Sequence, residues 1–362
     1  MTKKAFWCMV VPIVFASTTI YAESSFFNLD ETEGFKRYSI SVGPLHVMPQ
    51  GKAKAPKIRT AVKNGEVAKN GDITLSTVFE NLDPDKQKEN QSMQALLKIV
   101  DAFGDTYPAS QSGTSTVSGI ESWSMDGSGM TADDVTTLGI MINYHFNDKI
   151  SFESKAGFPP KVDIQGKGKI TAPFTAEANS TLLGIPLPTI YLKNDLPITD
   201  LESHGNSIAT ARAWTPMWEL QYHFGQTGIN KFRPYVGLGL MVAYFNELEL
   251  NPSLEKDLID SGHMIANMKN GRGGDALIKG KKSTANPKVK LESELSFAPI
   301  ATLGFTYDFN QNWFAVASIS YAHLTGKTTI EVNDDKLGTL FSSEVDLEVN
   351  PIIGYAGVGY RF

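Results

Sequence analysis

Two histidines occupy equivalent places in a repeated aromatic triplet, Tyr144-His145-Phe146 and Tyr222-His223-Phe224. An imidazole near a carboxylate can bind a metal ion or change its charge near neutral pH, and Glu153 and Glu219 are the neighbouring carboxylates. No His-x-x-x-His or similar ligand spacing accompanies these residues. We therefore expect a hydrogen-bonded polar cluster with no metal and no cofactor, and a metal site or titrating gate is the alternative.

Serine and histidine pairs that could support nucleophilic catalysis are few. Ser320 and His323 are close in sequence, but residues three apart on a strand lie on opposite faces. Ser318 with His145 is a second pair, which nothing else in the sequence supports. No Gly-x-Ser-x-Gly motif is present, and the sole cysteine is Cys8. We expect that the protein is not an enzyme.

The aromatic triplet recurs as Tyr307-Asp-Phe309 and Tyr360-Arg-Phe362. Turn residues directly follow three of the four copies, and the fourth ends the sequence. Each copy closes a run in which apolar and polar residues alternate with period two, which predicts a strand with one apolar face. Further alternating runs cover 36–48, 150–158, 232–245 and 313–324.

These runs predict eight strands joined by short turns at one end and long loops at the other. The loops cover roughly 49–133, 160–211, 246–293 and 325–346. Short periplasmic turns, long outer loops and an even strand number are typical of an antiparallel transmembrane β-barrel of the outer membrane. The aromatic pairs would form its periplasmic girdle. The alternative is a soluble β-sandwich, whose strands also alternate.

The first residues are typical of a secretory signal. Lys3 and Lys4 precede an apolar run, and small residues lead to Ala22, so we expect a signal peptide over 1–22 and a mature barrel over 23–362. The net charge of −6 becomes more negative without the two lysines, which argues against nucleic acid as a partner. We expect the protein in the outer membrane of a Gram-negative bacterium, in contact with its lipid.

Several stretches resemble the OmpW family of small outer-membrane barrels. They are 42–49, 138–158, 214–224, 233–239 and 359–362. The loops are longer than the family pattern implies, and 83–103 in the first loop has apolar residues at helical spacing. The apolar run 182–190 leaves open whether the second loop adds membrane strands.

Strand parity predicts which side chains face the lumen. An apolar upper half would contain Leu45, Val47, Met141, Met217, Met241, Phe245 and Ile300. A polar floor would contain His145, Glu153, Glu219, His223 and Asp308. A water-filled pore is polar throughout, so this division predicts passive entry of small hydrophobic molecules. The alternative is a structural or adhesive barrel that acts through its surface loops.

The resemblance implies that a ligand leaves sideways through the barrel wall. Proline cannot donate to a strand ladder, so we expect an exit at Pro44 and Pro351, where the first and last strands meet, or at Pro216 and Pro234. The alternative is that these prolines are tolerated at strand ends and bulges. The terminal Tyr360 and Phe362 resemble the signal that the outer-membrane assembly machinery reads, which predicts that machinery as a partner.

Overall fold

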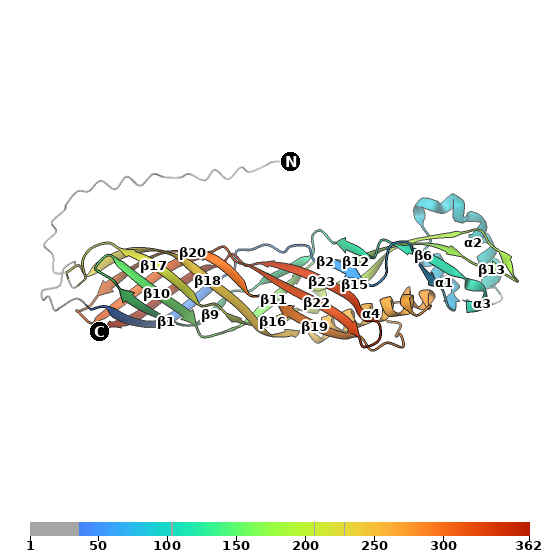
Figure 1. The fold of residues 1–362 in the computed structure, drawn as a ribbon. Helices are drawn as coiled ribbons and strands as arrows, with labels where there is room; N and C mark the ends of the chain where they lie inside the picture. Colours follow the sequence, from blue (N-terminus) through green and yellow to red (C-terminus); the bar gives the residue numbers. More distant parts are fainter. Residues whose placement is uncertain (1–35, 103, 206, 228) are drawn as a thin grey trace, which may run out of the picture.

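The computed structural model describes residues 36–102, 104–205, 207–227 and 229–362. The signal peptide predicted for 1–22 lies outside the described residues. The molecule is elongated, with a β-barrel at the end that holds the C-terminus and a folded extension at the other end (Figure 1). Among the described residues, no helix is long and apolar enough to cross a membrane.

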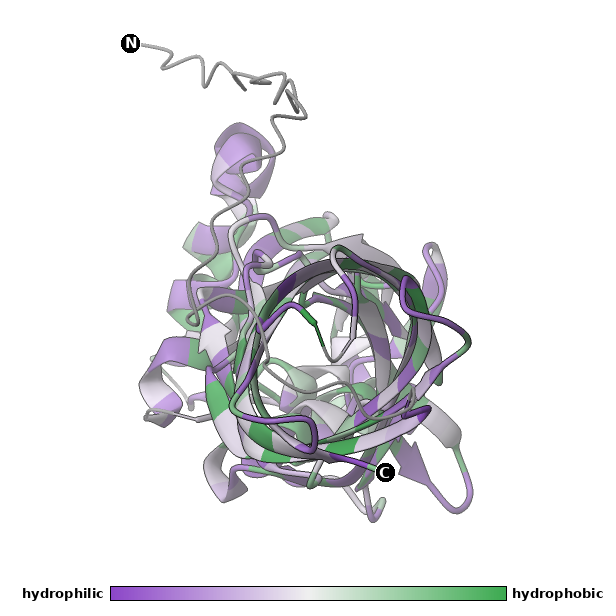
Figure 2. Cartoon of the chain, turned by 90° about the vertical axis from the view of Figure 1, so that its left-hand side faces the viewer, coloured by the Kyte–Doolittle hydropathy of each residue, from purple (hydrophilic) through white to green (hydrophobic). Residues whose placement is uncertain are grey.

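Eight antiparallel strands form a closed barrel, as the sequence predicted. They are β1 (Tyr38–Met48), β9 (Val135–His145), β10 (Ile150–Gly157), β17 (Met217–His223), β18 (Phe232–Leu250), β20 (Ser296–Asp308), β21 (Trp313–Ala322) and β24 (Ile352–Arg361). Each strand pairs with the next along this order, and β24 pairs with β1 to close the ring. The barrel is a continuous ring when viewed along its axis (Figure 2).

The aromatic triplets mark the end of the barrel where the turns are short. In all four copies the two aromatic rings lie edge to face, with centroids 5.1 to 6.0 Å apart. Phe146, Phe224, Phe309 and Phe362 are exposed on the outside. The predicted parity is therefore confirmed, since aromatic residues face outward and the alternate residues face the lumen.

The segments that we predicted as long loops contain strands and helices of their own. Directly above the barrel, β11 (Lys161–Lys167), β16 (Ala209–Trp214) and β8 (Gly129–Ala132) continue its sheet. A second sheet contains β19 (Lys288–Ser293), β22 (Thr325–Asp334), β23 (Gly338–Glu348), β2 (Lys57–Thr60) and β7 (Ser122–Ser124). We call these strands the collar.

The far end of the extension is a separate sheet with helices, which we call the cap. Its sheet has the order β15 (Ile190–Asp200), β12 (Lys169–Asn179), β6 (Thr114–Ser118) and β3 (Glu66–Lys69). Its helices are α1 (Leu75–Glu80), α2 (Gln87–Asp101), α3 (Ala109–Ser112), α4 (Pro252–Lys269) and α5 (Gly273–Ala276). Sheet and helices share one apolar core with part of the collar.

Short elements complete the cap. They are β4 (Ile73–Thr74), β5 (Thr106–Tyr107), β13 (Thr181–Leu182), β14 (Ile185–Pro186) and the 3-10 turns Pro84–Lys86 and Leu201–His204. The helix predicted for 83–103 is confirmed by α2, although residue 103 lies outside the described residues. The apolar run 182–190 forms a hairpin in the cap, so it adds no strand to the barrel.

Candidate ligand-binding lumen

The apolar side chains predicted for the upper lumen do face inward. Leu45, Met141, Met217, Met241 and Ile300 are buried in one cluster inside the barrel, and Val47 and Phe245 pack against it. They come from β1, β9, β17, β18 and β20, so neighbouring strands bring them to one level because each contributes alternate residues.

Above this cluster lies an elongated apolar cavity with about 1270 Å³ of atom-free space, part of it open to solvent. Leu45, Val47, Met241 and Phe245 line it. Met141, Met217 and Ile300 are not among its lining residues; they belong to the packed core. We had expected the seven residues to form one pocket. The structure divides them between the packed core and the cavity, because the cavity extends upward into the collar.

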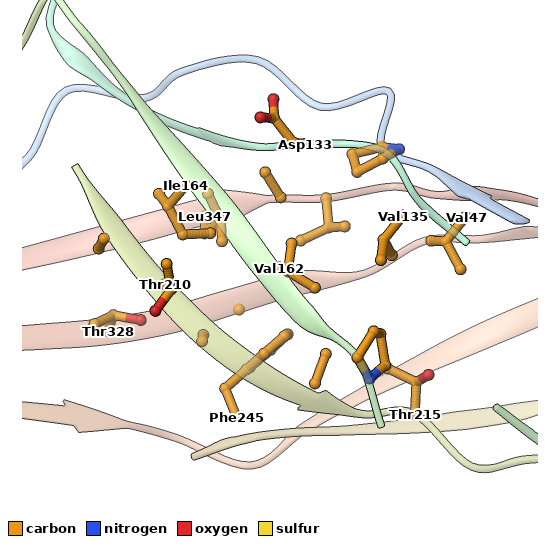
Figure 3. A pocket seen from close by; sticks show the side chains of 18 of the residues that line it. Val47, Asp133, Val135, Val162, Ile164, Thr210, Thr215, Phe245, Thr328 and Leu347 are labelled. Carbon is orange, nitrogen blue, oxygen red and sulfur yellow. The ribbon is translucent and has the colours of Figure 1, made fainter. Parts of the chain in front are cut away.

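The collar supplies lining residues that sequence reasoning missed. Val162 of β11 points into the same space as Val135 and Phe245, which belong to the barrel strands β9 and β18 (Figure 3). Val345 and Leu347 of β23 complete this part of the wall. The missed signal was the alternation of Val345, Leu347 and Val349 with acidic residues, which is strand periodicity that begins inside the predicted loop 325–346.

Below the apolar core, buried charges fill the lumen. The Lys155 Nζ lies 3.2 Å from Glu153 Oε1 and 3.3 Å from Glu219 Oε1. The Arg361 Nη1 lies 2.7 Å from Asp308 Oδ2, and the guanidinium stacks over the Phe314 ring. The predicted polar floor is thus present.

The two histidines lie within this floor. The rings of His145 and His223 are 5.2 Å apart, and Arg233 donates to the Asp148 carbonyl oxygen at 2.6 Å. Sequence reasoning missed Arg233, although its position on β18 has the same parity as Met241. The floor therefore contains equal numbers of cations and carboxylates, and we call it the plug. The cations are Lys155, Arg233 and Arg361, and the carboxylates are Glu153, Glu219 and Asp308.

Buried serine and histidine side chains in the barrel lack the arrangement of a catalytic triad. Ser320 is buried and contacts Lys155 at 3.4 Å, whereas His323 is exposed on the other face of the chain. Ser151 Oγ lies 2.7 Å from His223 Nε2. However, His223 Nδ1 has no hydrogen-bond partner among the described residues, so no carboxylate orients this pair as a nucleophile and base require.

A hydrogen-bonded row in the cap joins Ser253, His204 and Asp257. Ser253 Oγ lies 2.7 Å from His204 Nδ1, and His204 Nε2 lies 3.3 Å from Asp257 Oδ2. Ser253 also bonds to Asn251, the residue that caps α4. This row secures the start of a helix. The described residues contain no group of three or more His, Cys, Asp or Glu placed to hold a metal ion.

Comparisons with known proteins agree with this architecture. The model of the OmpW family matches residues 274–362. Outer membrane protein W of Vibrio cholerae serotype O1 is 26% identical over 227 residues, which are 63% of this chain and 74% of that protein. The predicted resemblance to the OmpW family is confirmed. Accordingly, this OmpW-like protein lies in the outer membrane of a Gram-negative bacterium.

Solved structures with similar folds include further outer-membrane barrels. OprG from Pseudomonas aeruginosa is 16% identical, with 92% of this chain and 99% of OprG covered and a TM-score of 0.46. AlkL in lipid bilayers is 14% identical, with 92% and 93% covered and a TM-score of 0.38. Since outer-membrane barrels have short periplasmic turns and longer extracellular loops, the collar and the cap lie outside the cell.

The seam between the first and last strands of the OmpW-like barrel is closed. Pairing of β1 with β24 covers Ser39–Val42 and Leu45–Met48, with a gap at Gly43 and Pro44. Pro44 lies within it, and Pro351 lies just before β24, where its carbonyl accepts from the Ala322 N–H at 3.1 Å. The ladder is therefore interrupted at Pro44 while the two backbones stay in close contact at Gly43, and an exit at this seam stays a prediction.

Pro216 and Pro234 do not lie together, which corrects the second expected exit. The Pro216 carbonyl accepts from Val242 on β18, whereas Pro234, eight residues earlier on the same strand, pairs with Phe305 near the turns. Pro216 instead lies across from the junction of β10 and β11, where Pro159 and Pro160 interrupt the wall. Sequence reasoning missed this proline pair, although it directly follows the predicted strand 150–158.

The ladder of backbone hydrogen bonds is interrupted at this junction. On one side, pairing of β10 with β9 ends at Gly157 opposite Gly139. One further bond joins the Phe158 N–H to the Leu138 carbonyl, and the next joins the Asp133 N–H to the Asp163 carbonyl. On the other side, pairing with β17 ends at Lys155 opposite Met217 and resumes where the Ala213 N–H donates to the Pro160 carbonyl at 3.0 Å. The cavity reaches this junction, where its lining residues are Gly157, Pro160, Val162, Val135 and Thr215.

The aromatic pair predicted as an assembly signal lies at the periplasmic end of β24. The Tyr360 ring contacts both Phe362 and Trp313, at 5.1 Å each. The Phe362 N–H donates to the Tyr38 carbonyl of β1 at 2.8 Å. Recognition by the assembly machinery stays a prediction.

Proposed function

We propose that this OmpW-like barrel is a passive channel for small hydrophobic molecules. The observation that carries the proposal is the apolar cavity that lies above the charged plug. Pockets for small molecules are concave and mostly apolar, with few polar groups. Here Asp133, Glu249 and a few threonines are the polar minority of the lining.

The plug explains why such a ligand would not continue to the periplasm through the lumen. Lys155 and its carboxylate partners are at most 2% exposed. Separating a buried ion pair leaves charges uncompensated and costs about 3–5 kcal/mol. A hydrophobic molecule cannot repay this cost with hydrogen bonds.

We place the exit at the junction of β10 and β11. Pro159, Pro160 and Pro216 supply no N–H to the ladder, and the cavity reaches the wall at Gly157 and Val162. A molecule that crosses the wall here passes between apolar outer residues, since Phe158 is exposed on the outside. It would therefore enter the hydrocarbon phase without crossing the plug.

Filling the cavity tests the channel. Ala211 lines the cavity, so Ala211→Phe should slow entry of a hydrophobic probe into reconstituted vesicles by about tenfold or more, as a barrier higher by ~1.4 kcal/mol would. Ala317→Phe, on the outer face of β21, is the control and should transport normally. Large steady ion conductance without hydrophobic uptake in the unchanged protein would overturn the proposal.

Replacing the prolines tests the exit. The triple change Pro159→Ala, Pro160→Ala and Pro216→Ala restores three N–H donors and should slow uptake while the barrel still folds. Pro234→Ala, which lies near the turns and lines no part of the cavity, is the control. Equal uptake by both variants would place the exit elsewhere.

A loop-mediated interaction is the second candidate function. At the tip of the cap hairpin, Leu183 and Ile185 are 85% and 67% exposed. Leu183 has a positive φ of 51°, which is uncommon outside glycine and asparagine. Such exposed apolar residues favour contact with another surface.

A further inference from the structure

The cap contains a second cavity that is separate from the lumen. It has about 710 Å³ of atom-free space, part of it open to solvent, and none of its lining residues lines the lumen cavity. One wall is the cap sheet, with Val117, Phe174 and Leu192. The opposite wall is helical, with Leu75, Leu97 and Leu277. Because most of the cap precedes residue 274, it lies largely outside the part of the chain that the family model matches.

The lining carries no charge. It contains no Asp, Glu, Lys, Arg or His, and its polar members are asparagine, serine and tyrosine. A carboxylate or an amine bound here would lose its hydration without gaining an opposite charge, which is costly. The occupant that suits this cavity is therefore uncharged.

Nearly all polar side chains around the cavity are already satisfied within the protein. Asn70 Nδ2 donates to the Ser112 carbonyl, and Ser115 Oγ donates to Asn70 Oδ1, both at 2.6 Å. The Tyr107 hydroxyl donates to the Thr181 carbonyl at 2.5 Å. Among the polar side chains that line the cavity, Ser180 is the exception, because its hydroxyl is not satisfied within the protein.

Ser180 is only 8% exposed, and its Oγ has no hydrogen-bond partner among the described residues. A buried hydroxyl without a partner costs about 1–3 kcal/mol. It lies at the root of the β13–β14 hairpin and lines the cavity. A ligand that supplies one hydroxyl or carbonyl oxygen would satisfy it.

We propose that the cap cavity binds a small uncharged molecule with an apolar body and a single hydrogen-bonding oxygen, which contacts Ser180. The ligand class is thus a medium-chain alcohol, ketone or ester. The site differs from the lumen, which has a larger and almost wholly apolar lining. It does not depend on the proposed uptake, since the two cavities share no residue.

Methyl NMR of the full-length protein in lipid nanodiscs tests the site with 1-hexanol as the probe. Methyl signals of Leu75, Leu97 and Leu192 should shift and saturate as 1-hexanol is added. Ser180→Ala should weaken 1-hexanol binding at these methyls about fivefold, the effect of one lost hydrogen bond. Binding of n-hexane, which has no oxygen, should be unchanged by the same substitution.

Two cavity-filling variants separate the sites. Ala178→Leu narrows the cap cavity and should remove the shifts for both probes, whereas Ala211→Phe fills the lumen and should leave them intact. If Ala178→Leu does not assemble, Ser180→Ala decides alone. No saturable shift at the three leucines, or equal 1-hexanol affinity in the wild type and Ser180→Ala, would overturn the proposal.

Discussion

Lys155 is the residue on which the charge balance of the plug depends. Its ammonium lies between two carboxylates in a site from which water is excluded. Lys155→Met would leave Glu153 and Glu219 facing each other without a cation. We expect a loss of about 3–5 kcal/mol in the free energy of unfolding, measured by urea unfolding in lipid vesicles.

Lys161→Met is the matched control for this prediction. Lys161 pairs with Glu249 at 2.8 Å, but these side chains are 48% and 65% exposed. Exposed pairs contribute about 0–1 kcal/mol. Similar losses for the two variants would show that the plug residues are hydrated in the folded barrel.

Asp334 fixes the turn between β22 and β23 in the collar. Its carboxylate accepts backbone N–H bonds from Asn286, Leu337 and Lys336 at 2.8 to 2.9 Å. These bonds lower the pKa of Asp334 below its ordinary value of 3.8, because they favour the charged form.

The stability that Asp334 contributes therefore depends on pH in a defined direction. Because its pKa is lower in the folded protein, the contribution is present above pH 3.8 and is lost as pH falls through the folded pKa. In Asp334→Asn, hydrogen exchange at the turn should be faster at pH 7 and should lose this acid dependence. Asp335→Asn, which removes an exposed ion pair with Lys288, should leave the exchange rates nearly unchanged.

The barrel is closed by the pairing of β1 with β24. Gly43 of β1 sets how closely these two strands approach each other. A Cβ atom at Gly43 would overlap the carbonyl oxygen of Ala356. At Gly354 of the same strand pair, a Cβ atom would meet open space. Only glycine permits such a close approach of backbones.

Gly43→Ala should therefore lower the fraction of compact barrel that migrates faster than the unfolded chain in unheated gels. Gly354→Ala should assemble like the wild type. If Gly43→Ala assembled normally, the seam would be able to relax, and an opening between β1 and β24 would remain a candidate exit.

Element positions in the barrel could be predicted because each strand has one apolar face. Leu138, Ile140 and Ile142 alternate with lumen residues such as Met141, and the structure confirms both faces. The collar could not be predicted in the same way. There, the short strands β2 and β11 pair with strands distant in sequence, and no aromatic triplet marks the ends of the collar strands.

The same distinction applies to the candidate site. The alternation of side chains along a strand is enough to place Glu153, Glu219 and Asp308 in the plug. This inference requires only that the strand and its direction are known. The cavity depends on how Val162 and Leu347 meet across two sheets, and the wall interruption depends on which strand lies opposite Pro160. Those are properties of tertiary pairing, which a single sequence does not specify.

At the scale of the whole molecule, the chain separates a barrel with an apolar lumen cavity from a distal cap. The chain enters and leaves the cap at neighbouring points, because Thr60 donates to the carbonyls of Glu121 and Ile120 at 3.1 and 2.8 Å. Ile170 and Thr199 are likewise paired where the β12–β15 hairpin begins. Short linkers in place of 63–118 and 172–196 would therefore remove most of the cap without stretching the collar.

This truncation distinguishes the two candidate functions. If the barrel acts as a channel, the truncated protein should still admit a hydrophobic probe, since none of the removed residues lines the lumen cavity. If the cap acts by binding a surface, adhesion of cells that carry the protein should be lost. Ala211→Phe in the full-length chain provides the converse control, because it fills the lumen and keeps the cap. A folded truncated barrel without uptake would show that the cap delivers the molecules that the lumen admits.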